Sequence, residues 1–237
     1  DYISSSGTSL RTSCCCLMKI IHFSDWHGRL NPVRWADLYI ITGDMCKNYP
    51  TRQKYEILPK READLQKAWI DKVGKTFRST YLENPKAPIV IIRGNHDFTD
   101  LAPMVGGEVY EITEDSTIVY KILGKKIGGF RGIPLIDHVS IWSDQILDPE
   151  ADTRTRRMPL DLDIIVTHTP PSGILDDAYG TSLGMRALSA YATRAAYEGE
   201  EKERLFCFGH IHERGGEIKA IGNNTFSNAA TTRNTLD

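Results

Sequence analysis

Short apolar runs recur along the chain, and each gives way to a polar or glycine-containing turn. Runs of this length that are rich in Ile, Val and Phe predict buried strands. The clearest candidates are residues 18–23, 38–42, 88–92, 163–167 and 205–208. Weaker candidates are residues 117–123, residues 126–131 beyond a turn at Gly124, and two short strands on either side of Asn223-Asn224.

Two stretches have helical periodicity instead. Apolar side chains recur every fourth residue between positions 58 and 82, at Leu65, Trp69, Val73, Phe77 and Tyr81, and Ala68 and Ile70 broaden this stripe. This stripe predicts one amphipathic helix, which Asn84-Pro85 ends. A second helix is expected at residues 181–197, whereas 98–116 and 132–160 are expected to form loops. Strands that alternate with helices indicate an α/β fold.

Composition limits the class of protein. The chain has 237 residues, of which 41% are hydrophobic and 25% charged, as in ordinary globular domains. We expect one domain over residues 18–237, after an N-terminal extension of uncertain structure at residues 1–17. No apolar run is long enough to span a membrane. The net charge of −2 gives no overall field that would attract nucleic acid.

The five cysteines do not suggest a disulfide framework. Cys14, Cys15 and Cys16 are consecutive, and Cys46 and Cys207 stand alone. An odd count with this spacing is typical of reduced thiols, so we expect a cytoplasmic location. The seven histidines are unremarkable in number. Their positions along the chain are more informative.

Five of the predicted strands end in side chains that commonly bind metals. In chain order these are Asp25-Trp26-His27, Gly43-Asp44, Gly94-Asn95-His96-Asp97, His168 and Gly209-His210-Ile211-His212. In an extended chain, residues two apart point to the same side, so Asp25 and His27 are expected to converge. The motif glycines are expected to let the backbone bend sharply. Carboxylate, imidazole and amide ligands without a thiolate favour Mn, Fe, Zn or Mg over a structural zinc.

Each motif is weak alone, but the ordered set resembles the calcineurin-like metallophosphoesterases. Their pattern is Asp-x-His, Gly-Asp, Gly-Asn-His followed by Asp or Glu, a lone His, and Gly-His-x-His. The resemblance covers about residues 20–215. It implies a four-layer αββα sandwich, in which two mixed sheets are flanked by helices and a dinuclear metal site lies at the strand ends.

The resemblance also implies roles for individual residues. One metal ion would be held by Asp25, His27, Asp44 and His212. The other would be held by Asp44 as a bridge, Asn95, His168 and His210. His96 would not bind metal but would face the leaving group, as a general acid or as a positive charge. A metal-bridging hydroxide would attack phosphorus in line, and the two ions are expected to be Mn, with Fe, Zn, Mg or Ni as alternatives.

Differences from the family pattern indicate the branch. The Gly-Asp motif is followed by Met45-Cys46-Lys47, and the Gly-Asn-His motif is followed by Asp97. Both differ from the Ser/Thr protein phosphatases and argue against that branch. The short first connection, the residues around His168 and Glu213 after the last motif look more like the small phosphodiesterases. That branch includes the metallophosphoesterase-domain-containing proteins and class III cyclic-nucleotide-phosphodiesterase-like enzymes. The expected function is therefore phosphodiester hydrolysis of small or nucleotide-like substrates.

Three alternatives stay open: a DNA or RNA nuclease, a phosphomonoesterase, and a non-catalytic metal-bound interaction module. Residues 47–86 carry a local net charge of +5, which indicates either a polyanion footprint or the solvated face of a helix. Nucleic acid is therefore a less favoured partner than a small phosphoester. Arg154, Arg156 and Arg157 suggest a phosphate clamp or a solvated loop, and His22 and His138 are expected to pack. No residue is assigned to substrate binding, and no oligomeric state is assigned.

Overall fold

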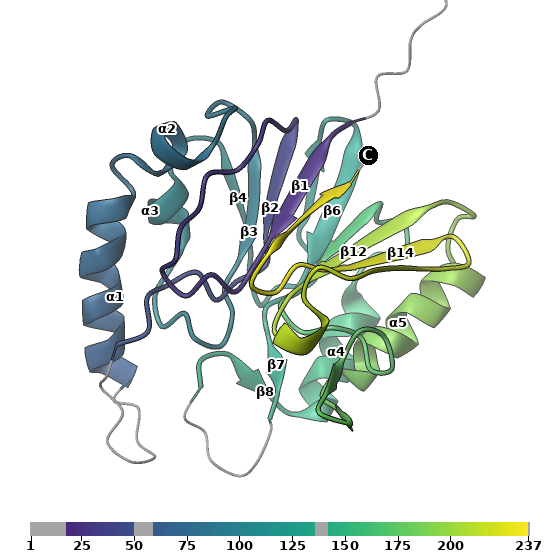
Figure 1. Ribbon diagram of the computed structural model, residues 1–237. Coiled ribbons are helices and arrows are strands. Elements are labelled where there is room, and N and C mark those ends of the chain that lie inside the picture. Colours follow the sequence, from purple (N-terminus) through teal and green to yellow (C-terminus); the bar gives the residue numbers. More distant parts are fainter. Residues whose placement is uncertain (1–17, 50–58, 136–141, 237) are drawn as a thin grey trace, which may run out of the picture.

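The computed structural model describes residues 18–49, 59–135 and 142–236. Two mixed sheets lie face to face, and helices cover the outer side of each (Figure 1). This arrangement confirms the expected four-layer α/β architecture. The interpretations of residues 1–17 and of His138 concern positions outside the described residues.

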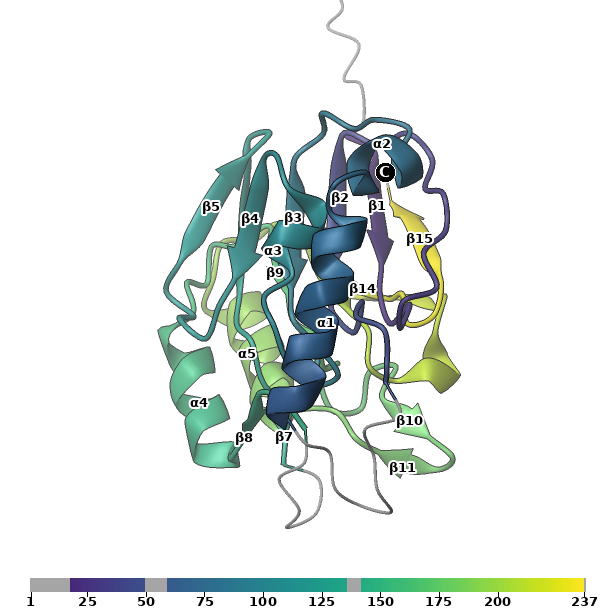
Figure 2. The same ribbon diagram turned by 90° about the vertical axis from the view of Figure 1, so that its left-hand side faces the viewer.

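The first sheet has five strands and carries the first three motifs. Its order is β15 (Arg233–Leu236), β1 (Ile20–Phe23), β2 (Leu38–Ile41), β3 (Ile89–Ile92) and β4 (Val109–Ile112). Only the edge strand β15 is antiparallel to its neighbour. The helices over its outer face are α1 (Pro59–Val73), α2 (Phe77–Tyr81) and α3 (Ala102–Val105). In Figure 2, α1 crosses in front of this sheet.

The second sheet has six strands, ordered β13 (Ile218–Ile221), β14 (Asn224–Asn228), β12 (Arg204–Phe208), β9 (Ile164–Val166), β6 (Lys125–Gly129) and β5 (Val119–Ile122). Its two edge strands are antiparallel to their neighbours. Its outer helices are α4 (Asp148–Arg157) and α5 (Arg186–Tyr197). The smaller elements are β7 (Ile133–Pro134), β8 (Gln145–Ile146), β10 (Asp177–Ala178), β11 (Thr181–Ser182) and the 3₁₀ helix η1 (His212–Arg214).

Three hydrophobic clusters fill the three interfaces between the four layers. Because side chains alternate along a strand, each central strand contributes to two of them. In β1, Ile21 and Phe23 pack towards the helices, while Ile20 packs between the sheets. In β12, Phe206 and Phe208 pack under α5, while Cys207 lies between the sheets. The nearly continuous apolar runs in the sequence therefore reflect strands that are buried on both faces.

The predicted strands are present, but β4, β15, α3, α4 and the two-residue strands β7, β8, β10 and β11 were not predicted. The second expected helix begins at Arg186 rather than at residue 181, because residues 181–182 form β11. Helix α4 buries only Ala151 and Thr155, so it has no apolar stripe to reveal it. Its charges do follow the helix dipole, with Asp148 and Glu150 in the first turn and arginines in the last. Residues 132–160 are thus partly helical rather than a loop, and residues 98–116, also expected to be a loop, contain α3 and β4. In the part of the chain that the structure describes, no helix has the length and apolar character needed to cross a membrane.

The expected single helix over residues 58–82 is interrupted after Val73. The backbone leaves the helix at Gly74, where an added Cβ atom would lie 2.4 Å from the carbonyl oxygen of Pro103. The chain then turns, and α2 begins at Phe77. Close packing of α3 against this point therefore replaces one long helix by two shorter ones.

The buried face of α1 coincides with the predicted apolar stripe only at Ile70. The residues that α1 buries are Glu62, Gln66 and Ile70, whereas Trp69 and Val73 are half-buried. Gln66 donates through Nε2 to the carbonyl oxygen of His96 (2.7 Å), and its Oε1 accepts the N–H of Phe98 (2.7 Å). A buried polar side chain of this kind needs such partners. Helix α1 therefore fixes the loop after β3 by hydrogen bonds.

His22 joins the two sheets, consistent with the packing role expected for it. Its imidazole is fully buried, with Nδ1 2.9 Å from Oγ of Ser227 on β14 and Nε2 2.9 Å from Oγ1 of Thr42 after β2. Burial lowers the pKa of His22 to about 3, although the charge of Asp25 opposes this effect. His22 is therefore neutral in the folded protein at neutral pH.

This lowered pKa predicts acid sensitivity. The unfolded chain takes up a proton at His22 near its ordinary pKa of about 6.5, whereas the folded protein does not. The stability due to neutral His22 is complete above about pH 6.5 and is lost as the pH falls towards 3, by about 1.4 kcal/mol per pH unit. Urea unfolding of wild type and His22→Gln from about pH 7 to about pH 4.5 measures it. Parallel pH profiles for the two proteins would contradict this role.

Candidate metal centre

All the motif side chains predicted from the sequence gather at one end of the two sheets. They follow parallel strands, whose carboxyl ends meet at one edge, which is where α/β sheets place ligands. The first sheet supplies Asp25 and His27 after β1, Asp44 after β2, and Asn95 and His96 after β3. The second supplies His168 after β9, and His210 and His212 after β12.

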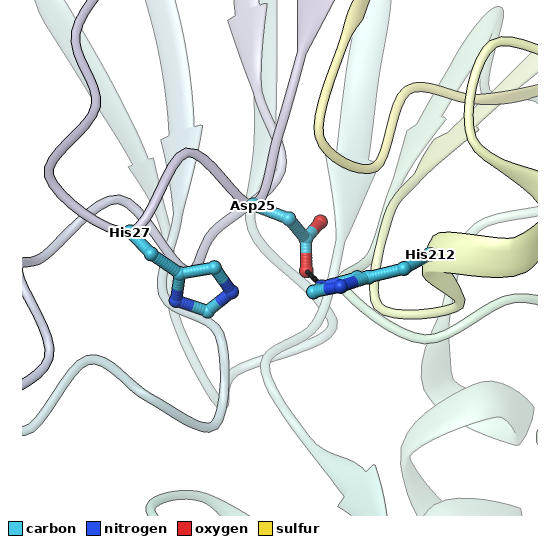
Figure 3. Close-up of side chains that lie close together, drawn as sticks. All are labelled: Asp25, His27 and His212. Carbon is cyan, nitrogen blue, oxygen red and sulfur yellow. Dashed lines mark hydrogen bonds and ion pairs between the residues drawn. The ribbon is translucent and has the colours of Figure 1, made fainter.

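Asp25, His27 and His212 form one group, drawn in Figure 3. One potential ligand atom from each lies within 4.8 Å of the others. Nε2 of His212 is 3.2 Å from Oδ1 of Asp25, and the rings of His27 and His212 are 5.4 Å apart between centroids. The fold therefore brings together a carboxylate and two imidazoles, although Asp25 and His212 are 187 positions apart in the sequence.

A second group surrounds Asp44. Asp25, Asp44 and His168 have potential ligand atoms within 4.8 Å of one another, and Nε2 of His168 lies 3.5 Å from Oδ2 of Asp44. That same nitrogen is 3.1 Å from Oδ1 of Asn95, and the ring of His210 lies 5.0 Å from the ring of His168. Asp44 is thus central to the cluster. The individual ligand roles remain predictions.

His96 lies at the rim of this cluster. Its Nε2 is 4.0 Å from Oδ2 of Asp44, and its ring is 4.8 Å from that of His27 between centroids. Potential ligand atoms of His27, Asp44 and His96 also lie within 4.8 Å of one another, although the family resemblance assigns His96 no role in metal binding. The side chain is 19% exposed, compared with 2% for Asp44. His96 is therefore placed where it can reach a molecule that enters from solvent.

The backbone at the site differs from the extended geometry expected from the sequence. Asp25, His27, Asp44 and His210 have φ angles of 57°, 45°, 52° and 69°. Left-handed backbone is uncommon outside glycine and clusters at functional sites. His212 lies in η1 rather than in an extended strand end. The side chains do converge, but through left-handed turns and a short helix instead of strand alternation.

Gly94 provides space rather than a bend. Its φ is not in the left-handed region, but a Cβ atom there would lie 2.2 Å from Oδ1 of Asp44 and 2.6 Å from Cε1 of His168. The backbone after β3 therefore runs directly against two of the predicted ligands. Only glycine allows this approach without moving one of them.

The electrostatics of the site favour positive charge. Burial disfavours protonation of His168, but the carboxylates of Asp44 and Asp25 outweigh burial and raise its pKa to about 10. Burial also works against ionised Asp44, yet His168 and His96 hold the pKa of Asp44 well below its ordinary value. Burial and repulsion from His168 lower the pKa of His210 to about 4. Ionised carboxylates, imidazoles and an amide oxygen make a donor set that fits divalent metal ions.

Asp97 supports the site through hydrogen bonds to the backbone, a role that the sequence did not reveal. Its buried carboxylate accepts the N–H groups of Asp44 (2.6 Å), Cys46 (2.9 Å) and Gly94 (3.0 Å). Burial and the charge of Asp44 raise the pKa of Asp97 to about 6. The acidic residue after Gly-Asn-His therefore ties the loop after β2 to the loop after β3.

Asn48 was also missed, and it connects two of the motif histidines. Its Nδ2 lies 3.2 Å from Nδ1 of His27, and its Oδ1 lies 3.2 Å from Nδ1 of His96. Sequence reasoning named no residue that orients His96, because Asn48 lies 48 positions away from it. One amide side chain thus links a predicted metal ligand to the predicted acid.

The ring of Trp142 packs against the ring of His96, with 4.4 Å between ring centroids. The segment that carries it is held in place by the N–H of Ser143, which donates to the carbonyl oxygen of Asn95 (3.0 Å). Asp144 forms ion pairs with Arg93 and Arg131. Arg154, for which the sequence suggests a phosphate clamp or a solvated loop, forms an ion pair with Glu150 and donates to the carbonyl oxygen of Arg131.

Comparison with protein families agrees with the motif set. Residues 18–214 match the family described as calcineurin-like phosphoesterase, so the chain belongs to that family. Members of the family are metal-dependent phosphoesterases, and the clustered acids and histidines are suited to hold the metal.

Two curated relatives share part of the chain. It is 26% identical over 206 residues to "Probable rhamnogalacturonate lyase C" of Emericella nidulans, which covers 86% of this chain but 18% of that protein. It is 36% identical over 75 residues to "UPF0046 protein K07C11.7" of Caenorhabditis elegans, which covers 32% of this chain and 23% of that protein. The chain thus spans less than a quarter of either relative, and the activity named for the first belongs to that protein.

Gly94→Ala tests whether the tight packing at the site matters for metal binding. The new methyl group must displace Asp44 or His168, so we expect divalent-metal affinity to fall about 10- to 100-fold. Gly124→Ala is the matched control, because nothing lies within 4 Å of its added Cβ. Because Gly124 has a φ of 80°, Gly124→Ala is expected to lose about 1–2 kcal/mol of folding stability. Its affinity for the metal ion is expected to stay unchanged. Titration calorimetry with Mn²⁺ compares them, and equal affinities would refute the argument.

Proposed function

We propose that this protein is a dinuclear metal-dependent phosphodiesterase that acts on small or nucleotide-like phosphoesters. The observation that carries the proposal is the convergence of Asp25, His27, Asp44, His168 and His212 at the carboxyl ends of both sheets. Because both sheets contribute, residues 18–237 are proposed to work as one domain. Family membership supports the phosphoester chemistry.

Two divalent ions would be held by the predicted ligands. Asp25, His27, Asp44 and His212 would hold one, and Asp44, Asn95, His168 and His210 the other. Such ions lower the pKa of water and neutralise charge on a phosphoryl group. Mn²⁺ is proposed first, since nitrogen and oxygen donors without a thiolate suit it, with Fe, Zn, Mg or Ni as alternatives.

The chain's own residues supply the acid and its orientation. His96 would donate a proton from Nε2 to the departing oxygen, which otherwise leaves as an unstable anion. Asn48 contacts Nδ1 of the same ring, so it directs Nε2 towards the Asp44 side of the site. Trp142 limits movement of the ring on its other face. Asp97 and Gln66 hold the loop that carries His96.

The choice of a diester rests on sequence features and on the surroundings of the site. The short connection after β1 and Glu213 after the last motif are similar to the small phosphodiesterase branch. A large groove beside His27 leaves room for the second substituent of a diester. A cytoplasmic setting is proposed as well, because Cys46 and Cys207 are buried free thiols.

Asp44→Asn tests the proposed chemistry. Removing the central carboxylate is expected to lower Mn²⁺-dependent hydrolysis of bis-p-nitrophenyl phosphate by at least about 100-fold. Asp71→Asn, the same change at an exposed position of α1, is the control. Full activity of Asp44→Asn, or metal binding without turnover in the wild type, would contradict the proposal. Parallel assays with p-nitrophenyl phosphate, cyclic nucleotides and DNA separate diesterase, monoesterase and nuclease.

His96 and Asn48 are tested by the choice of leaving group. A phenyl leaving group needs a proton more than p-nitrophenyl does, and general acids contribute about 10²–10⁴-fold. We therefore expect His96→Ala to slow hydrolysis of a nucleoside phenyl phosphate far more than that of the p-nitrophenyl ester. Asn48→Ala should show the same selectivity to a smaller extent. Asn223→Ala, in an exposed turn, is the control, and equal losses with both substrates would show that neither residue serves proton transfer.

A further inference from the structure

A groove of about 1210 Å³ opens beside the metal cluster. Asp25, His27 and His212 line one part of it, and Trp69, Lys72 and Tyr81 line another. The loop after β1 and helix α1 therefore form two of its sides. Sites for small ligands usually have volumes of about 300–1,000 Å³, so this groove can hold much more than a single phosphate.

The charges that line the groove are nearly all positive. Arg29, Lys47 and Lys72 face it, and the one carboxylate in its lining is Asp25, which belongs to the metal cluster. Among the residues that the structure describes, none of these three cations has an ion-pair partner. In a chain with a net charge of −2, this grouping favours an anionic ligand.

Lys47 is held close to the cluster by its backbone. The loop after β1 is bonded to the loop after β2, from the N–H of His27 to the carbonyl of Asp44 and from Gly28 to Met45, each 2.9 Å. Gly28 leaves so little room that a Cβ atom there would lie 2.8 Å from Cβ of Lys47. The side chain of Lys47 therefore starts beside the loop that carries His27. Its Nζ lies over the ring of Tyr49, 5.4 Å from the ring centroid, and has no carboxylate partner among the described residues.

The far part of the groove is aromatic. Trp69 and Val73 lie one turn apart on α1, and together with Tyr81 they are half-buried. One side of each packs against the core beneath the first sheet, while the rest lines the groove. An aromatic surface beside cations is suited to stack a nucleobase whose phosphates contact those cations.

We propose that this groove binds a nucleotide that carries a second phosphate group, such as a 5′-phosphorylated dinucleotide. This inference rests on the proposed function, which places the reacting diester at the metal cluster. The second phosphate contacts Lys47 and Lys72, and the base stacks on Trp69. Hydrolysis adds one water across the reacting P–O bond, which leaves a phosphate monoester on one product and a hydroxyl on the other. Three cations suit two or three phosphate charges better than a polymer, whose binding relies on many contacts.

The test measures binding to the metal-loaded full chain. Titration calorimetry in excess Mn²⁺ compares adenosine 3′,5′-bisphosphate with AMP, and we expect the bisphosphate to bind about fivefold or more tightly. Lys72→Ala should remove most of that advantage. Lys67→Ala is the matched control, because this exposed lysine on α1 does not line the groove. Equal losses in both variants would show a non-specific charge effect and overturn the proposal.

Trp69 is tested with a ligand that lacks a base. Trp69→Leu should weaken adenosine 3′,5′-bisphosphate about tenfold but leave inorganic pyrophosphate unchanged, and Trp69→Phe should recover part of the loss. Equal weakening of both ligands would exclude stacking. Tighter binding of oligo(dT) than of a 5′-phosphorylated dinucleotide would point to nucleic acid and overturn the small-nucleotide assignment.

Turnover is measured separately from binding. With 5′-phosphorylated and unphosphorylated ApA as substrates, the phosphorylated form should have the higher kcat/KM. Selective binding without any hydrolysis would retain the groove assignment and refute the proposed activity. Hydrolysis without preference for the second phosphate would support the proposed activity and refute the groove assignment.

Discussion

Two buried carboxylates at the junction of the sheets determine the rest of the site. Asp25 and Asp44 are almost fully removed from water, and ionised groups in such positions need compensation. Asp25 accepts the N–H of His210 and lies beside Nε2 of His212. Asp44 accepts the N–H of His96 and faces His168. The first two motifs thus supply the carboxylates, and the other three supply donors or positive groups to this pair.

Holding two like charges close together requires a rigid frame. The pKa of His168 is raised to about 10 because the carboxylates stabilise positive charge at this point, and a divalent ion supplies more of it than a proton does. The frame itself is built from hydrogen bonds, since Asp97 binds three backbone N–H groups and Gln66 clamps the loop after β3. Left-handed backbone at Asp25 and Asp44 is maintained by this frame.

The sequence was sufficient for most of the central strands and for the motif residues, because both depend on local patterns, whereas the order of layers was implied only by the resemblance to the calcineurin-like family. Strands buried on both faces appear as apolar runs, and motif residues follow their ends. The supporting residues could not be found this way. Asn48 and His96 are 48 positions apart, and Glu62 and Gln66 are polar residues on the buried face of α1. Hydrophobic periodicity identifies what packs against apolar surface, whereas these side chains are buried to bind backbone.

Helix α1 illustrates the difference most clearly. Most of the apolar stripe that predicted it is only half-buried, while the face that enters the interior combines the apolar Ile70 with the polar Glu62 and Gln66. An amphipathic helix on a globular domain normally buries its apolar stripe. Here the polar face serves the loop that carries His96, so Trp69 and Val73 are turned towards the groove. The contacts that place α1 beside the chemical site therefore also leave Trp69 on the wall of the groove.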